Sequence, residues 1–126
     1  MDFNVLREYI AKDFVMQTLV GDNIFLVDRP EKCSCDNYIT YSPKELGSVG
    51  GGVHAYQIDI RVVSKSKLNL LTIKDRLINL LDDHNRATHI TDGDVRIRKI
   101  RLINGGGIAK ADNGDYYAFL YFHAII

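Results

Sequence analysis

The stretch from residue 54 to residue 85 constrains the fold most, because it predicts one strand followed directly by one helix. Its first part alternates between apolar and polar residues, with apolar side chains at Tyr56, Ile58, Ile60 and Val62. A period of two predicts a strand with one buried face. After a potential N-cap at Ser66, apolar residues recur at helical spacing: Leu70, Ile73, Leu77, Leu80 and Leu81. We expect this helix to pack on the apolar face of the strand.

Length and charge place the chain in a broad class. A chain of 126 residues predicts a single domain spanning residues 1–126. Its 16 basic and 16 acidic residues give a formal net charge of zero, which argues against a protein that binds by wrapping nucleic acid. A neutral surface also repels other copies only weakly, so it tolerates association.

The sequence offers no membrane or secretion signal. The residues after Met1 lack both a basic segment and a long apolar segment, so we expect no secretory signal. No run approaches the roughly 18–20 apolar residues of a membrane span. Cys33 and Cys35 stand one residue apart, where a bridge would be strained, and a cytoplasm keeps thiols reduced. We therefore expect free thiols.

The first part of the chain predicts a helix and two short strands. Asp2 is a suitable N-cap for a helix from residue 3 to about residue 19, and Gly21 stands where a C-terminal glycine belongs. Residues 23–27 and 37–41 each predict a short strand.

The stretch 42–53 predicts a long loop, because Pro43, Gly47 and Gly50 to Gly52 interrupt sparse apolar residues. A phosphate-binding loop would need a Lys-Ser/Thr ending and a helix directly after it, whereas His54 opens a strand. Loops this long are usually functional or disordered. Two interpretations stay open, a mobile loop that orders against a partner and a simple disordered connection.

Residues 95–103 predict a strongly basic strand, with Arg96, Arg98, Lys99 and Arg101. Its apolar residues change phase, which a bulge near Arg98 would reconcile. Because no excess of positive charge appears elsewhere, a solvated or interfacial face is favoured over a nucleic-acid platform. A second long loop, 104–115, follows with an Asn-Gly turn signal at residues 113–114.

The last strand, residues 116–126, is apolar or aromatic on both faces. Its second face carries Tyr117, Phe119, Tyr121 and His123. A strand with helices on one side and water on the other should not show this pattern. A subunit interface is one interpretation, and an ordinary two-sided core is the other.

No catalytic constellation stands out. The four histidines, at positions 54, 84, 89 and 123, are scattered over different predicted elements. No nucleophile elbow, zinc-protease motif or nucleotide fingerprint occurs. We therefore predict no enzyme activity, no catalytic residues, no cofactor and no metal.

The order of these elements, together with the residues that form them, resembles the tail terminator (tail completion) proteins of long-tailed bacteriophages. The resemblance covers most of the chain and is carried by four stretches: Leu19 to Phe25, Asn37 to Tyr41, Tyr56 to Leu81, and Tyr116 to Ala124. It implies an α+β fold, in which two helices pack on one face of an antiparallel sheet that has two long loops. It also implies a virion protein of the tail or neck, assembled in the host cytoplasm.

In such a protein a homohexameric ring caps the tail tube, stops its polymerisation and provides the joint to the head connector. The implied partners are further copies of the chain, the tail tube protein and the head-tail connector protein, while DNA passes through the lumen without sequence-specific binding. The alternatives are a head-side neck or adaptor (head-tail joining) protein and a small cytoplasmic binding domain. The candidate partner contacts come from both loops, the basic strand and the last strand: Lys44, Glu45, Val49, Gly50, Gly51, Gly52, Arg96, Arg98, Arg101, Gly106, Ile108, Lys110, Tyr117, Phe119, Tyr121 and His123.

Overall fold

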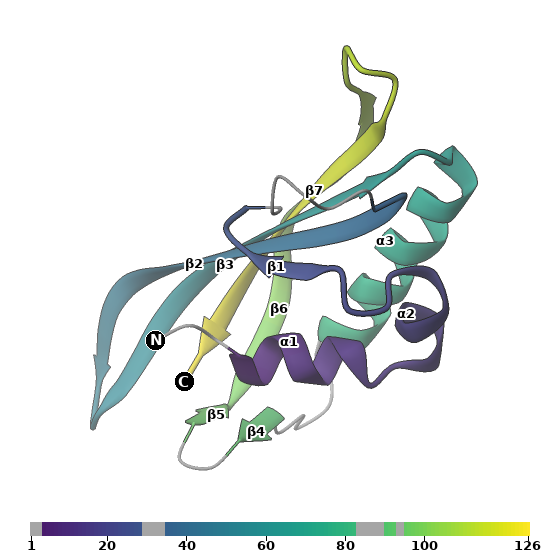
Figure 1. The fold of residues 1–126 in the computed structure, drawn as a ribbon. Helices are drawn as coiled ribbons and strands as arrows, with labels where there is room; N and C mark the ends of the chain where they lie inside the picture. The colour runs from purple at the N-terminus through teal and green to yellow at the C-terminus, as the bar shows by residue number, and fades with distance from the viewer. Residues whose placement is uncertain (1–3, 29–34, 83–89, 93–94) are drawn as a thin grey trace.

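A five-stranded sheet with helices on one side forms the frame of the protein (Figure 1). The structure, a computed structural model, describes residues 4–28, 35–82, 90–92 and 95–126. In chain order the elements are α1 (Asn4–Ala11), α2 (Phe14–Leu19), β1 (Ile24–Leu26), β2 (Asn37–Gly50), β3 (Val53–Ser64), α3 (Lys67–Leu81), β4 (Ile90–Asp92), β5 (Val95–Ile97), β6 (Lys99–Lys110) and β7 (Tyr116–Ile125).

The large sheet has the strand order β1-β2-β3-β7-β6, and β4 and β5 form a separate two-stranded sheet. The predicted α+β class, with helices packed on one face of a sheet, is confirmed. The sheet is mixed rather than antiparallel throughout, because β1 pairs with β2 in parallel. Alternation of side chains predicts strands but carries no information on their direction, which is why the sequence did not reveal this pair.

The central strand-helix unit is as predicted. Ser66 caps α3, with its hydroxyl oxygen accepting a hydrogen bond from the backbone N–H of Asn69 at 3.3 Å. The apolar residues of β3 and α3 meet in one core and are fully buried: Ile58, Ile60, Val62, Leu70, Ile73, Leu77 and Leu81. Burial of each such side chain contributes about 1.5–3 kcal/mol, so this unit contributes a large part of the stability.

The predicted first helix is in fact two helices, α1 and α2. Asp13 begins α2 as its N-cap, and its carboxylate accepts a hydrogen bond from the N–H of Met16 at 3.3 Å. The same carboxylate accepts hydrogen bonds from Arg76 of α3, with Nη2–Oδ1 at 2.6 Å. A helix continuing through Asp13 would lose this cap, so the polar contact outweighs the apolar periodicity. The predicted cap at Asp2 lies outside the described residues.

The prediction of two long loops is wrong. Residues 42–53 form the outer part of a hairpin, in which β2 continues to Gly50 and β3 begins at Val53. Gly51 and Gly52 make the turn, with φ of 61° and 77°. Likewise β6 continues to Lys110, which leaves a short turn at 111–115. The hydrogen bonds between paired strands come from the backbone and do not require apolar side chains, so apolar periodicity does not reveal these two glycine-rich strand segments.

The predicted basic strand is two strands, which divide at Arg98, where the predicted phase change falls. β5 pairs with β4, whereas β6 joins the large sheet.

Cys35 is disulfide-bonded, so the expectation of free thiols is wrong for this residue.

Candidate assembly interface

The face of the large sheet opposite the helices is here called the open face. Strand register places polar and aromatic side chains of neighbouring strands together on it. The register pairs that define it join Phe25 to Thr40, Thr40 to Arg61, Arg61 to Phe119, Asp59 to Tyr121, and Gln57 to His123. The helix-covered face of the same strands is apolar and buried, with mostly aliphatic side chains beside Tyr41 and Phe122, so the two faces differ in chemistry.

An aromatic row runs along β7 on the open face. The rings of Tyr117 and Phe119 meet edge to face at 5.8 Å, and those of Phe119 and Tyr121 stack at 6.2 Å. Phe119 is 38% exposed, while Tyr117, Tyr121 and His123 are partly buried. Among the described residues this face is therefore not a second closed core. Rigid, partly exposed aromatic rings are typical of surfaces that bind other proteins.

A pocket of about 330 Å³ lies at one end of the open face. Side chains from β2, β3, β7 and the β6–β7 turn line it: Tyr38, Arg61, Val63, Ala111, Asn113, Asp115, Tyr117 and Phe119. The Nε atom of Arg61 is buried there without a hydrogen-bond partner. A buried donor without an acceptor costs about 1–3 kcal/mol. The positive charge of Arg61, which lines the pocket, favours an anionic group such as a carboxylate there.

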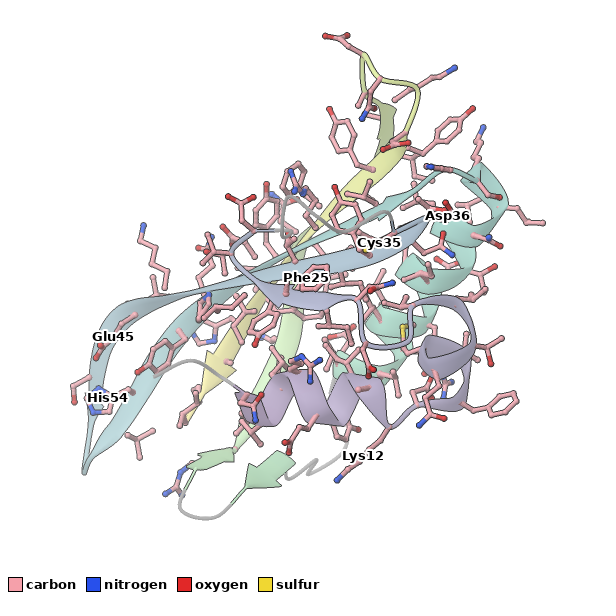
Figure 2. All side chains as sticks on the ribbon, in the orientation of Figure 1. Lys12, Phe25, Cys35, Asp36, Glu45 and His54 are labelled. Atoms are coloured by element: carbon pink, nitrogen blue, oxygen red, sulfur yellow. The ribbon has the colours of Figure 1, made fainter. Side chains whose placement is uncertain are left out.

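The opposite end of the sheet carries the arm, which we define as residues 44–54 of β2, β3 and their turn. Figure 1 shows this hairpin extending away from the helices. Near its tip Glu45 and His54 lie side by side, with Oε1 of Glu45 3.0 Å from Nδ1 of His54 (Figure 2). Leu46 is 50% exposed and Lys44 is exposed. The arm therefore presents charged groups beside an apolar side chain.

The structure brings some of the predicted contact residues together and separates others. Tyr117, Phe119, Tyr121 and His123 share the open face, and Arg101 joins them because it pairs in register with His123. Lys44, Glu45, Val49 and Gly50 belong to β2 in the arm, and Gly51 and Gly52 form its turn.

The remaining predicted residues lie on β5, on β6 or between them. Arg96 belongs to β5, and Arg98 is exposed just before β6. Gly106, Ile108 and Lys110 lie on β6, where the carbonyl oxygen of Gly106 accepts a hydrogen bond from Lys74 Nζ at 3.5 Å. Lys110 Nζ stands 5.6 Å from the centre of the Tyr116 ring. This end of β6 is thus held by α3 and β7.

Sequence reasoning missed the pocket and its arginine. The alternating pattern predicts Arg61 only as one of the polar residues of its strand, and nothing in the sequence distinguishes Tyr38 or Asp115. The register pairs Arg61 with Thr40 and Phe119, and it pairs Val63, two residues further along β3, with Tyr38 and Tyr117, so these side chains share one face. This shared face can be recognised only once the strand order is known.

Two other kinds of site can be judged only within the described ranges 4–28, 35–82, 90–92 and 95–126. There, no group of three or more His, Cys, Asp or Glu side chains could hold a metal ion. Nor does any helix in those ranges have the length and apolar character needed to cross a membrane.

The arrangement defines the class of fold: α+β, with a five-stranded mixed sheet covered on one side by helices. A solved structure shares it, namely a chain of the "Virion of native gene transfer agent (GTA) particle", with a TM-score of 0.72. The likeness covers 96% of this chain and 90% of that chain at 12% sequence identity, so it shows the fold and nothing finer. No protein-family model matches the sequence, and no curated protein matches it.

Proposed function

We propose that this chain is a structural virion protein of a phage or phage-like particle. In this proposal copies of the chain form a ring that caps the end of the tail tube. The ring stops tube polymerisation and provides the joint to the head connector. It has no enzymatic role, and DNA crosses the ring without being read.

The observation that carries the proposal is the end-to-end likeness in fold to a chain of a virion particle, which covers nearly all of both chains. Two features of the molecule support it. The open face carries a partly exposed aromatic row, and the arm extends from the sheet with an exposed apolar residue. Both are typical of a protein whose role is assembly with others.

Tube termination, rather than another virion role, rests on the resemblance in the order of elements. It is tested by deleting this gene from the phage or phage-like genome that carries it and imaging the lysate by electron microscopy. We expect overlong, unattached tails, because tube growth would lack its stop. Expression of the intact gene from a plasmid should restore normal length.

Other outcomes would redirect or end the proposal. Tails of normal length lying apart from DNA-filled heads would move the protein to the head side of the joint, as an adaptor. Intact infectious particles would contradict a structural role in the virion altogether.

A further inference from the structure

We propose that the arm of one copy of this chain docks in the Arg61 pocket of the next copy, with Leu46 between the aromatic rings and Glu45 on the Arg61 guanidinium. The inference deepens the proposed function, because it names the contact that closes the ring, and it rests on that function for the presence of a ring.

The pocket is suited to a segment that is apolar and acidic together. Its walls include the aromatic side chains of Tyr38, Tyr117 and Phe119, together with the positively charged side chain of Arg61. An occupant that covers this charge without a counter-charge would leave its desolvation uncompensated. An apolar side chain next to a carboxylate meets both needs.

The arm carries that combination. Glu45 and Leu46 are adjacent in β2, and both are about half exposed, with the Glu45 side chain at 54% and Leu46 at 50%. The pocket offers a cationic guanidinium beside an aromatic wall, so the carboxylate of Glu45 and the apolar side chain of Leu46 match it in charge and in polarity.

The arm cannot fill the pocket of its own chain. Tyr38 of the pocket and Glu45 of the arm lie on the same strand, seven positions apart in the sequence. At about 3.3 Å per strand residue, the two sites are roughly 23 Å apart and held there by the sheet. The occupant must therefore come from another molecule.

The positions of the two sites fix the kind of assembly. The arm lies at one end of the large sheet and the β6–β7 turn, which borders the pocket, lies at the other end (Figure 1). A contact between different patches of identical chains is head-to-tail, and repetition of such a contact closes into a ring when its rotation permits. The same contact made reciprocally would give only a dimer.

A charge-exchange experiment tests the contact on the whole chain. Glu45→Arg places two positive charges together at the contact, and Arg61→Glu places two negative charges there. We expect each variant alone to associate roughly 30-fold or more weakly than the unmodified protein. Mixed in equal amounts, the two variants should again form a large assembly, because each arm then meets a pocket of opposite charge. Lys12→Glu, an exposed change on the helical side, should leave association unchanged.

Analytical ultracentrifugation gives the mass of each assembly, and circular dichroism shows that each variant is folded. The inference would be overturned by an unmodified protein that stays monomeric, by single variants that still associate, or by a mixture that does not recover. Recovery to a dimer only would overturn the head-to-tail arrangement. If the association measurements contradict the contact while the gene deletion still gives overlong tails, the docking contact is wrong and the proposal of tube termination stands.

Discussion

The two faces of the large sheet differ in how completely they are buried. On β7 the covered face carries Ala118, Leu120, Phe122 and Ala124, all almost completely buried. Between them stand the residues of the open face, which keep part of their surface in water. Under the proposed function this strand serves two purposes, so its residues should divide into those that hold the fold and those that serve assembly.

The sharpest way to test this division is to truncate one phenylalanine on each face. Phe122→Ala removes a fully buried ring and should lower the free energy of unfolding by about 3–5 kcal/mol. Phe119→Ala removes a ring that is 38% exposed, so it should cost about 1 kcal/mol and weaken self-association. Urea unfolding measures the first effect and ultracentrifugation the second. Equal losses of stability would contradict the division between the faces.

Gly105 lies where the backbone of β7 leaves no room for a side chain on β6. A Cβ at this position would lie 2.3 Å from the carbonyl oxygen of Phe119, and the backbone φ is 102°. We expect Gly105→Ala to lower the free energy of unfolding by about 1–3 kcal/mol from backbone strain, with the clash adding to it.

Gly107 is a matched control, because its φ lies outside the positive range and a Cβ there meets nothing within 4 Å. Gly107→Ala should leave the denaturation midpoint in urea nearly unchanged. If both substitutions had the same small effect, the close approach of β6 to Phe119 would not depend on Gly105.

The sequence predicted the parts of the fold that apolar periodicity controls. The unit of β3 and α3, its cap at Ser66 and its place on one face of the sheet are as expected, because burial of one stripe leaves few alternatives. The sequence pattern predicts loops at the outer part of β2 and the glycine-rich part of β6, because the hydrogen bonds of these strands depend on backbone pairing rather than on apolar side chains. Half of the candidate site was likewise predicted, namely the aromatic row. The Arg61 pocket was not, because its walls come from segments that only the strand order brings together.

On the covered side, Asp13 joins two helices through a polar contact. It caps α2 and also accepts hydrogen bonds from Arg76, whose guanidinium holds the pKa of the Asp13 carboxyl below its ordinary value. Asp13→Ala should cost about 1–2 kcal/mol at neutral pH.

The sign of the pH dependence follows from that lowered pKa. A carboxyl whose pKa is lower in the folded state stabilises the fold above its unfolded value of about 3.9, and this contribution is lost as the pH falls through the folded value. The difference in unfolding free energy between the parent and Asp13→Asn should therefore shrink as the solution is acidified. A difference that grows in acid would contradict the ion pair. Self-association measured near neutral pH should not change, because Asp13 lies on the helical side.

The smallest expected effect distinguishes stability from assembly at a single residue. Arg61→Met keeps much of the side chain's length and removes the buried Nε that lacks a partner. In the monomer this should raise the free energy of unfolding by up to about 1 kcal/mol, because no unsatisfied donor remains. In the assembly it should weaken association, because the pocket no longer binds a carboxylate. Chemical denaturation at low protein concentration isolates the first effect, and ultracentrifugation at high concentration isolates the second. A higher free energy of unfolding together with weaker association would mean that the open face retains Arg61 for binding, at a cost in stability. A lower free energy of unfolding together with weaker association would mean that Arg61 supports the fold, and the two faces would then differ less than their chemistry indicates.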